Sequence, residues 1–202
     1  LVAELQLLKA QLNPHFLFNT LNNLYLLALQ KSDKTPMVIS KISDFFYYII
    51  YECNAVEVPV SKEIKLIDDY ILLEELRYSN HLSVIFQKDI DSADFRIPPM
   101  LLYSFVENCF KHGSSSDLKM PWIRLLIRIR KNYLEFEASN SIPSANCVND
   151  QITEGIGLST IKRRLELIYP KNHQLIIRKE NCTFFVRLVI QKTRTEIPEI
   201  YA

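Results

Sequence analysis

Several features that would assign a function class directly are scarce or missing in this sequence of 202 residues. The 24 basic and 23 acidic side chains are well mixed, which excludes the charged footprint of a nucleic-acid or membrane-surface binder. No window holds the roughly 20 apolar residues that a membrane-spanning helix needs, and the densest window, Phe45 to Tyr51, is far too short. Partners must therefore be inferred from individual sites.

Cysteine pairs are also missing. The four cysteines, Cys53, Cys109, Cys147 and Cys182, form no CxxC motif, and most of them have apolar neighbours. This pattern predicts reduced core thiols of a cytosolic protein rather than a disulfide or metal framework.

The chain has no initiator methionine and begins at Leu1, inside a helical pattern. We therefore expect a piece of a longer protein, in which a membrane or sensor segment precedes the part given. The hydrophobic content of 48% is enough for one or two domains with real cores. Glycine is rare as well: the three glycines are Gly113, Gly155 and Gly157, and all lie in polar motifs rather than in hairpin turns.

Two apolar helical stretches come first. Apolar residues recur at helical spacing from Leu1 to about Lys31, with an interruption at Pro14, and again from Met37 to about Asn54. Two helices this apolar cannot cover one another completely. We therefore expect a helical hairpin that pairs with a second copy of itself as a four-helix bundle.

The extended stretch VEVPV marks the predicted domain boundary, which gives domains of residues 1–55 and 56–202. Ser61 is expected to cap a helix that runs to about Ser79. Alternating strands then mix with helices, in the segments HLSVIFQKDI, IPPMLLYSFVENCFKHG, WIRLLIRIRK, YLEFEAS, GIGLSTIKRRLELIYP and QLIIRKENCTFFVRLVIQ. Runs of strands with helices on one face predict a two-layer α+β domain.

The helix around ENCFKHG carries a polar strip opposite its apolar face. Asn108, Lys111 and His112 stand at i, i+3 and i+4, and Glu107 lies four residues before Lys111. An amide oxygen for Mg²⁺ beside a lysine and a histidine suits the phosphates of a nucleoside triphosphate. The alternative is a solvated helix face with an ion pair, which is the commoner explanation of such a strip taken alone.

The segment EGIGLSTIKRRL opens a helix with two glycines. Gly155 and Gly157, just before Leu158, would let the backbone approach a phosphate at the free N–H groups of the helix start. A GxG pattern is weak evidence by itself. The scarcity of glycine elsewhere in the chain increases its weight.

The segment QLNPHFLFNTLNN places His15 on one strip with Gln11, Asn19 and Asn22, at i−4, i+4 and i+7. A mostly neutral imidazole can act as a nucleophile without a dedicated base, and neighbouring amides would fix its tautomer. A proline directly before it costs about 3 kcal/mol or more inside a helix, which a helix built only for packing would not carry. The alternative is a structural histidine, which is the usual role of a lone histidine on a helix.

The segments NPHFLFNTLN, IPPMLLYSFVENCFKHG and GIGLSTIKRRL, in this order and at these separations, resemble the LytS/YehU-type sensor histidine kinases of bacterial two-component systems. The resemblance covers nearly all of the chain. It implies a dimerisation and histidine phosphotransfer hairpin followed by a GHKL-type ATP-binding sandwich. It also implies that the protein phosphorylates itself on His15 with ATP and Mg²⁺, and passes the phosphoryl group to an aspartate of a response regulator.

The resemblance also implies roles for individual residues. The catalytic group would be His15 as phosphoacceptor with Asn19 and Glu107. The nucleotide-binding residues would be Asn108, Lys111, His112, Asn140, Gly155, Gly157 and Leu158. Asn108 would bind Mg²⁺, and Pro14 would loosen the helix so that His15 can be presented to a mobile catalytic domain. Arg77 stands where the family carries an arginine.

The sequence departs from the family pattern in the nucleotide site. Asn140 replaces the aspartate that accepts a hydrogen bond from the adenine amino group, the lid between Asn140 and Gly155 is short, and Thr160 replaces a usual asparagine. These changes leave open a dimeric signalling scaffold with a degenerate nucleotide site. An ATPase of the gyrase or chaperone type is a further alternative, against which the PHFLFN helix argues.

The resemblance implies two protein partners, a second copy of the chain and a response regulator. No direct contact with nucleic acid is expected, and contact with a membrane only through sequence outside this chain. The expected location is the cytoplasmic domain of an inner-membrane sensor.

Overall fold

A computed structural model describes residues 14–78, 81–91, 95–114, 118, 120–143 and 156–192. The chain divides into two compact units, Leu1–Val84 with Arg96–Tyr103 and Ile85–Phe95 with Ser104–Ala202. We call them the helical unit and the sheet unit. The boundary expected after residue 55, between a dimerisation and phosphotransfer domain and an ATP-binding domain, stays a prediction.

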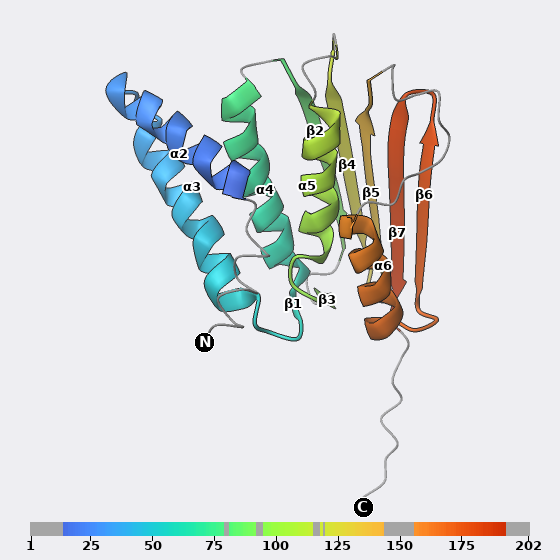
Figure 1. Cartoon of the computed structure of the whole chain (residues 1–202). Coiled ribbons are helices and arrows are strands. Elements are labelled where there is room, and N and C mark those ends of the chain that lie inside the picture. Colours follow the sequence, from blue (N-terminus) through green and yellow to red (C-terminus); the bar gives the residue numbers. More distant parts are fainter. Residues whose placement is uncertain are drawn as a thin grey trace, which may run out of the picture. The chain divides into compact units, whose positions relative to one another are not determined.

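The helical unit contains the predicted hairpin. Its elements are α2 (Pro14–Leu29), α3 (Thr35–Tyr47), the π-helix η1 (Tyr48–Glu52), α4 (Val60–Tyr78), and the two short antiparallel strands β1 (Val58–Pro59) and β3 (Arg96–Ile97). The α2 and α3 ribbons run side by side next to α4 (Figure 1). The described part of α2 begins at Pro14, and residues 1–13 of the predicted helix lie outside the described residues.

Four aromatic side chains form the centre of the helical unit. The ring of Phe16 lies 5.1 Å from that of Phe45 and 4.9 Å from that of Tyr70. Tyr103 adds an edge contact at 5.1 Å to Tyr70. All four residues are at most 6% exposed, so this cluster fixes α2 against α3 and α4.

The sheet unit contains a five-stranded sheet in the order β2-β4-β5-β7-β6. The strands are β2 (Ser83–Ile90), β4 (Trp122–Ile129), β5 (Tyr133–Ser141), β6 (His173–Glu180) and β7 (Thr183–Gln191). The helices α5 (Leu101–Gly113) and α6 (Ile156–Ile168) lie over one face of this sheet (Figure 1). The predicted α+β class is confirmed.

Alternation along β5 decides which side chains enter the core. Leu134, Phe136 and Ala138 are fully buried, and the Phe136 ring lies 6.2 Å from that of Phe105 on α5. Asn140 continues the same side of the strand, because successive side chains point to opposite faces. The sequence therefore brings a polar residue to the helix-covered face of the sheet.

The opposite face of β5 carries an ion-pair cluster. The Glu135 carboxylate is 6% exposed and accepts hydrogen bonds from Arg128 Nη1 at 2.9 Å and from Arg187 Nε at 2.7 Å. Burial raises the pKa of Glu135, but the two arginines outweigh it, and the net effect lowers that pKa below its ordinary value of 4.5.

Two expectations from the sequence are wrong. The helix α4 begins at Val60, so Ser61 lies in its first turn and does not cap it. Cys182 is disulfide-bonded, which contradicts the expectation of four reduced thiols, whereas Cys53 and Cys109 are free as expected. Cys147 lies outside the described residues. Cys109 is fully buried, and this burial raises the pKa of its thiol to about 12, as suits a core thiol.

Candidate functional site

His15 is presented on the surface of α2. Its neighbour Phe16 points into the aromatic cluster and is 6% exposed, while His15 itself is exposed. The amide Nδ2 of Asn19 lies 3.2 Å from both ring nitrogens of His15, one helical turn further on. The buried hydroxyl of Thr20 donates to the Phe16 carbonyl oxygen at 2.8 Å. The helix is thus anchored on the side opposite to an imidazole that is oriented by an amide.

The polar strip of α5 is present as predicted. Asn108 and Glu107 are half-buried and Lys111 is exposed, whereas the residues of the opposite, apolar face of α5 are buried. Desolvation, followed by the charge of Lys111, lowers the pKa of His112, so its imidazole is neutral at pH 7. The strip therefore offers an amide, one fixed cation and a neutral imidazole.

The start of α6 lies beside this strip. A Cβ atom placed on Gly157 would come within 3.7 Å of both Nδ2 and Oδ1 of Asn108, which is ordinary contact. The structure thus brings together two motifs that are 49 residues apart in the sequence, since 157 minus 108 is 49. Leu158 is buried at 8% exposure and anchors this helix start. Gly155 lies outside the described residues.

Asn140 has an unusual environment. The residue is 0% exposed, and its Nδ2 donates to the Ser141 carbonyl oxygen at 2.9 Å. Its Oδ1 is buried and accepts no hydrogen bond from the part of the chain that the structure describes. A buried acceptor without a donor costs about 1 to 3 kcal/mol, so native proteins rarely keep one without a reason.

Gly113 makes room for Asn140 at the end of α5. A Cβ atom on Gly113 would lie 2.6 Å from Cβ of Asn140 and 2.9 Å from its Nδ2, which is closer than real atoms approach. The hydroxyl of Ser141 also donates to the Gly113 carbonyl oxygen at 3.4 Å. Gly113 and Ser141 were not predicted as part of the site, although the scarcity of glycine in the sequence was a signal for Gly113.

The sheet unit therefore gathers Asn108, Gly157, Asn140 and Gly113 around the C-terminal part of α5. His15 and Asn19 belong to the helical unit. Arg77, the other family-matched residue of that unit, makes an ion pair with Glu74 at 3.1 Å. Within the described ranges, no group of three or more His, Cys, Asp or Glu side chains could hold a metal ion. The part of the chain that the structure describes also contains no helix long and apolar enough to cross a membrane.

A family model described as histidine kinase matches residues 3–82. The chain is 27% identical to the sensor protein LytS of Enterococcus faecalis over 177 residues, which cover 83% of this chain and 30% of that protein. It is 27% identical to the sensor histidine kinase BtsS of Escherichia coli over 163 residues, covering 81% of this chain and 28% of that protein. The chain thus spans less than a third of each of these relatives.

The solved Erythrobacter litoralis EL346 blue-light activated histidine kinase matches with a TM-score of 0.49 at 14% identity, covering 90% of this chain and 59% of that chain. The sequence evidence is more direct. The family match contains His15 and Asn19, and the matches to LytS and BtsS extend over about four fifths of the chain. By its sequence, the chain is similar to LytS-type sensor histidine kinases.

Proposed function

We propose that this chain is the core of an ATP-dependent protein-histidine kinase that phosphorylates itself on His15. The observation that carries the proposal is the exposed His15 ring with the Asn19 amide at 3.2 Å, inside the stretch that the histidine kinase family model matches. A polar i,i+4 pair on a helix surface contributes only about 0.2 to 0.5 kcal/mol to helix stability. The position of His15 suits a nucleophile that must reach a second site.

In this proposal a ring nitrogen of His15 attacks the γ-phosphorus of ATP. An N–P bond forms while the bond from phosphorus to the bridging oxygen breaks, and ADP leaves with that electron pair. Asn19 orients the imidazole, which suits a reaction that depends mostly on positioning. The phosphoryl group then passes to a carboxylate of a response regulator, and His15 is regenerated.

The nucleotide would bind in the sheet unit. Oδ1 of Asn108 is the kind of oxygen that Mg²⁺ prefers, and bound Mg²⁺ would neutralise phosphate charge. Backbone N–H groups at the beginning of the described part of α6, at Gly157 and Leu158, suit a phosphate, and Lys111 and His112 lie on the same strip as Asn108. Glu107, which directly precedes Asn108 in the sequence, is proposed as a catalytic residue. Gly155 is proposed for the same glycine motif on sequence alone.

The orphan oxygen of Asn140 supports an adenine base at this position. The adenine amino group is a donor, and it would satisfy the buried Oδ1, which no group of the described residues satisfies. The hydrogen bond from Nδ2 to Ser141 fixes the amide so that its oxygen remains the acceptor. The residues present therefore fit an adenine nucleotide, with a neutral amide in place of a carboxylate.

This neutral amide also favours the second candidate function, a dimeric signalling scaffold with a degenerate nucleotide site. A neutral acceptor contributes about 0.5 to 1.5 kcal/mol, against about 1.5 to 3 kcal/mol for a charged one, so weak ATP binding follows. A scaffold would bind nucleotide weakly and transfer no phosphoryl group. The labelling experiment below separates the two functions.

A homodimer through the hairpin is part of the proposal. Large apolar side chains on α2 and α3 are 41 to 66% exposed in the single chain, and they are Phe18, Leu21, Tyr25, Leu26, Leu29, Met37, Ile39 and Tyr47. So much apolar surface on two adjacent helices is typical of an interface.

We further propose that the chain works as the cytoplasmic part of an inner-membrane sensor, through sequence outside the part given. We also propose that it contacts a response regulator but no nucleic acid.

Incubation with γ-labelled ATP and Mg²⁺ tests the function. We expect a label that is lost in acid and stable in base, as a phosphoramidate is, and that is absent from His15→Gln. The matched control is His81→Gln, because His81 is also an exposed histidine of the helical unit. A label that resists acid, or that persists in His15→Gln, contradicts the proposal, and no label with retained ATP binding favours the scaffold.

A further inference from the structure

One buried carboxylate holds the start of α5. Glu63 lies in the first turn of α4 and is 0% exposed. Its oxygens accept hydrogen bonds from the backbone N–H groups of Met100, of Leu102 at 3.1 Å and of Tyr103 at 3.3 Å. All these residues belong to the helical unit. A single side chain of α4 thus serves three donors at the beginning of another helix.

This arrangement replaces a local helix cap. The first N–H groups of a helix lack helical partners, and a serine, threonine or aspartate just before the helix usually accepts from them. The residue at that position is Met100, which has no such acceptor and whose φ of 63° is uncommon for a residue with a side chain. Because Glu63 supplies the acceptor from α4, the placement of the first turn of α5 depends on where this carboxylate is held.

The same carboxylate is also bound to the end of the hairpin. The hydroxyl of Tyr48, the first residue of η1, donates to Oε1 of Glu63 at 2.6 Å. Burial, followed by the charge of Glu63, raises the pKa of Tyr48 far above its ordinary value, so the hydroxyl stays a donor. Short π-helical segments such as η1 are rare and occur mostly at functional sites.

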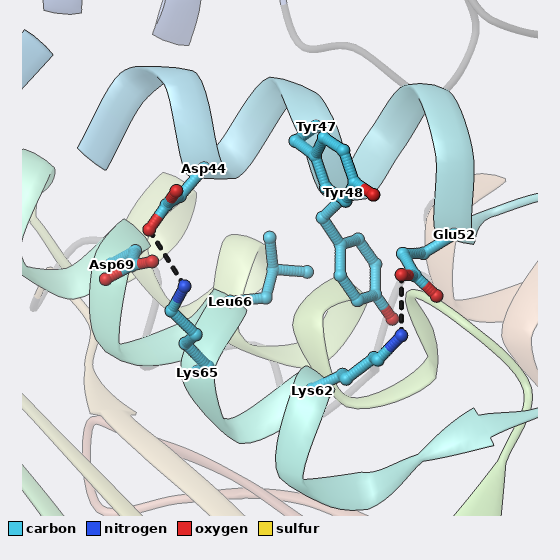
Figure 2. A pocket seen from close by; sticks show the side chains of 8 residues that line it. All are labelled: Asp44, Tyr47, Tyr48, Glu52, Lys62, Lys65, Leu66 and Asp69. Atoms are coloured by element: carbon cyan, nitrogen blue, oxygen red, sulfur yellow. Dashed lines mark hydrogen bonds and ion pairs between the residues drawn. The ribbon is translucent and has the colours of Figure 1, made fainter. Parts of the chain in front are cut away.

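The Tyr48 ring is 6% exposed and lies between η1 and α4. The ring reaches from η1 toward α4 and lines a cavity of about 180 Å³ between them (Figure 2). Two ion pairs flank it, Lys65 to Asp44 at 2.8 Å and Lys62 to Glu52 at 2.6 Å. Such solvent-exposed pairs contribute little to stability. The hydrogen bond to Glu63 fixes the position of the Tyr48 hydroxyl, in addition to the burial of the ring.

We propose that Tyr48 and Glu63 are positioning residues of the nucleotide site, which couple the end of the hairpin to α5. The inference rests on the proposed function, because it assigns a regulation to the same site. The helix α5 is continuous from Leu101 to Gly113 and carries Asn108 about two turns after its start. A change in η1 that moves the Tyr48 hydroxyl thus reaches Asn108 through the first turn of α5.

The test compares Tyr48→Phe with Tyr51→Phe. Each variant removes one hydroxyl from η1, but Tyr51 is 66% exposed and serves as the matched control. Amide hydrogen exchange is measured along α5, with the amides of β5 as a reference for general loss of stability. Phosphorylation of His15 is measured in parallel at saturating ATP and Mg²⁺.

In Tyr48→Phe we expect exchange about tenfold faster from Asn108 to Gly113, unchanged exchange in β5, and about tenfold slower phosphorylation. Tyr51→Phe should change each quantity by less than about twofold. Unchanged exchange between Asn108 and Gly113, or an unchanged phosphorylation rate, would overturn the coupling. If the unmodified protein labels no histidine, the proposed function fails, and the exchange comparison alone still supports or refutes the coupling.

Discussion

Replacing Asn140 by alanine separates a ligand-binding role of this residue from a structural one. The change deletes the buried Oδ1, which accepts no hydrogen bond within the described ranges, and Nδ2, which donates to the Ser141 carbonyl oxygen at 2.9 Å. If Asn140 only ended a strand, the protein would be expected to lose stability and keep its ligand affinity. If Asn140 is kept for an adenine amino group, the variant should instead retain most of its stability and lose ligand affinity.

The contacts of Asn140 give the expected size of both effects. Removing an unsatisfied buried acceptor stabilises the fold by about 1 to 3 kcal/mol, and losing the hydrogen bond to Ser141 costs about 0.5 to 1.5 kcal/mol. The small cavity left behind costs about 1 kcal/mol. We therefore expect the free energy of unfolding of Asn140→Ala to stay within about 1.5 kcal/mol of that of the unmodified protein. The ligand loses at least about 1 kcal/mol of binding, which is about fivefold in affinity.

Urea unfolding and calorimetric titration with ATP and Mg²⁺ measure the two quantities on the same samples. Ser139→Ala is the matched control, since Ser139 precedes Asn140 on β5 and points to the other face of the sheet. Its hydroxyl donates only to the Arg124 carbonyl at 3.4 Å, so neither quantity should change. A loss of more than about 3 kcal/mol in Asn140→Ala with unchanged ATP affinity would refute the reasoning.

Three further predictions concern the two units. Gly113→Ala should destabilise the fold by about 1 to 3 kcal/mol in urea unfolding, because its Cβ would clash with Asn140, and Asn140→Gly should relieve the loss. Because the pKa of Glu135 is lowered in the folded state, its ionised carboxylate stabilises the fold above pH 4.5. This stabilisation is lost as the pH falls below that value. Unfolding of Glu135→Gln should therefore show a smaller loss of stability between pH 7 and pH 3 than unfolding of the unmodified protein. Leu26→Asp should shift light scattering toward the 23.7 kDa monomer, and an unchanged dimer mass would contradict the proposed interface.

The sequence predicted most of the fold where local patterns decide it. The strands β4 and β5 follow from strict alternation, and their turn follows from the short polar break between Ile129 and Tyr133. These features depend on neighbours in the sequence, which is why no coordinates were needed to predict them.

Features that depend on distant residues could not be predicted. Glu63 stands in the charged stretch SKEIK and resembles a solvated first turn, but its donors are Tyr48 and the backbone at Met100. The start of α4 at Val60 directly follows β1, and β1 pairs with β3 at Arg96 and Ile97, which are distant in the sequence. The disulfide at Cys182 is also set by the fold rather than by cysteine spacing.

The most direct test of the central claim is to locate the phosphoryl group. The chain has four histidines, at positions 15, 81, 112 and 173. After incubation with ATP and Mg²⁺, fragmentation mass spectrometry at neutral pH assigns the phosphorylated residue. We expect the phosphoryl group on His15 alone. A phosphoryl group on any other residue, with none on His15, would contradict the account.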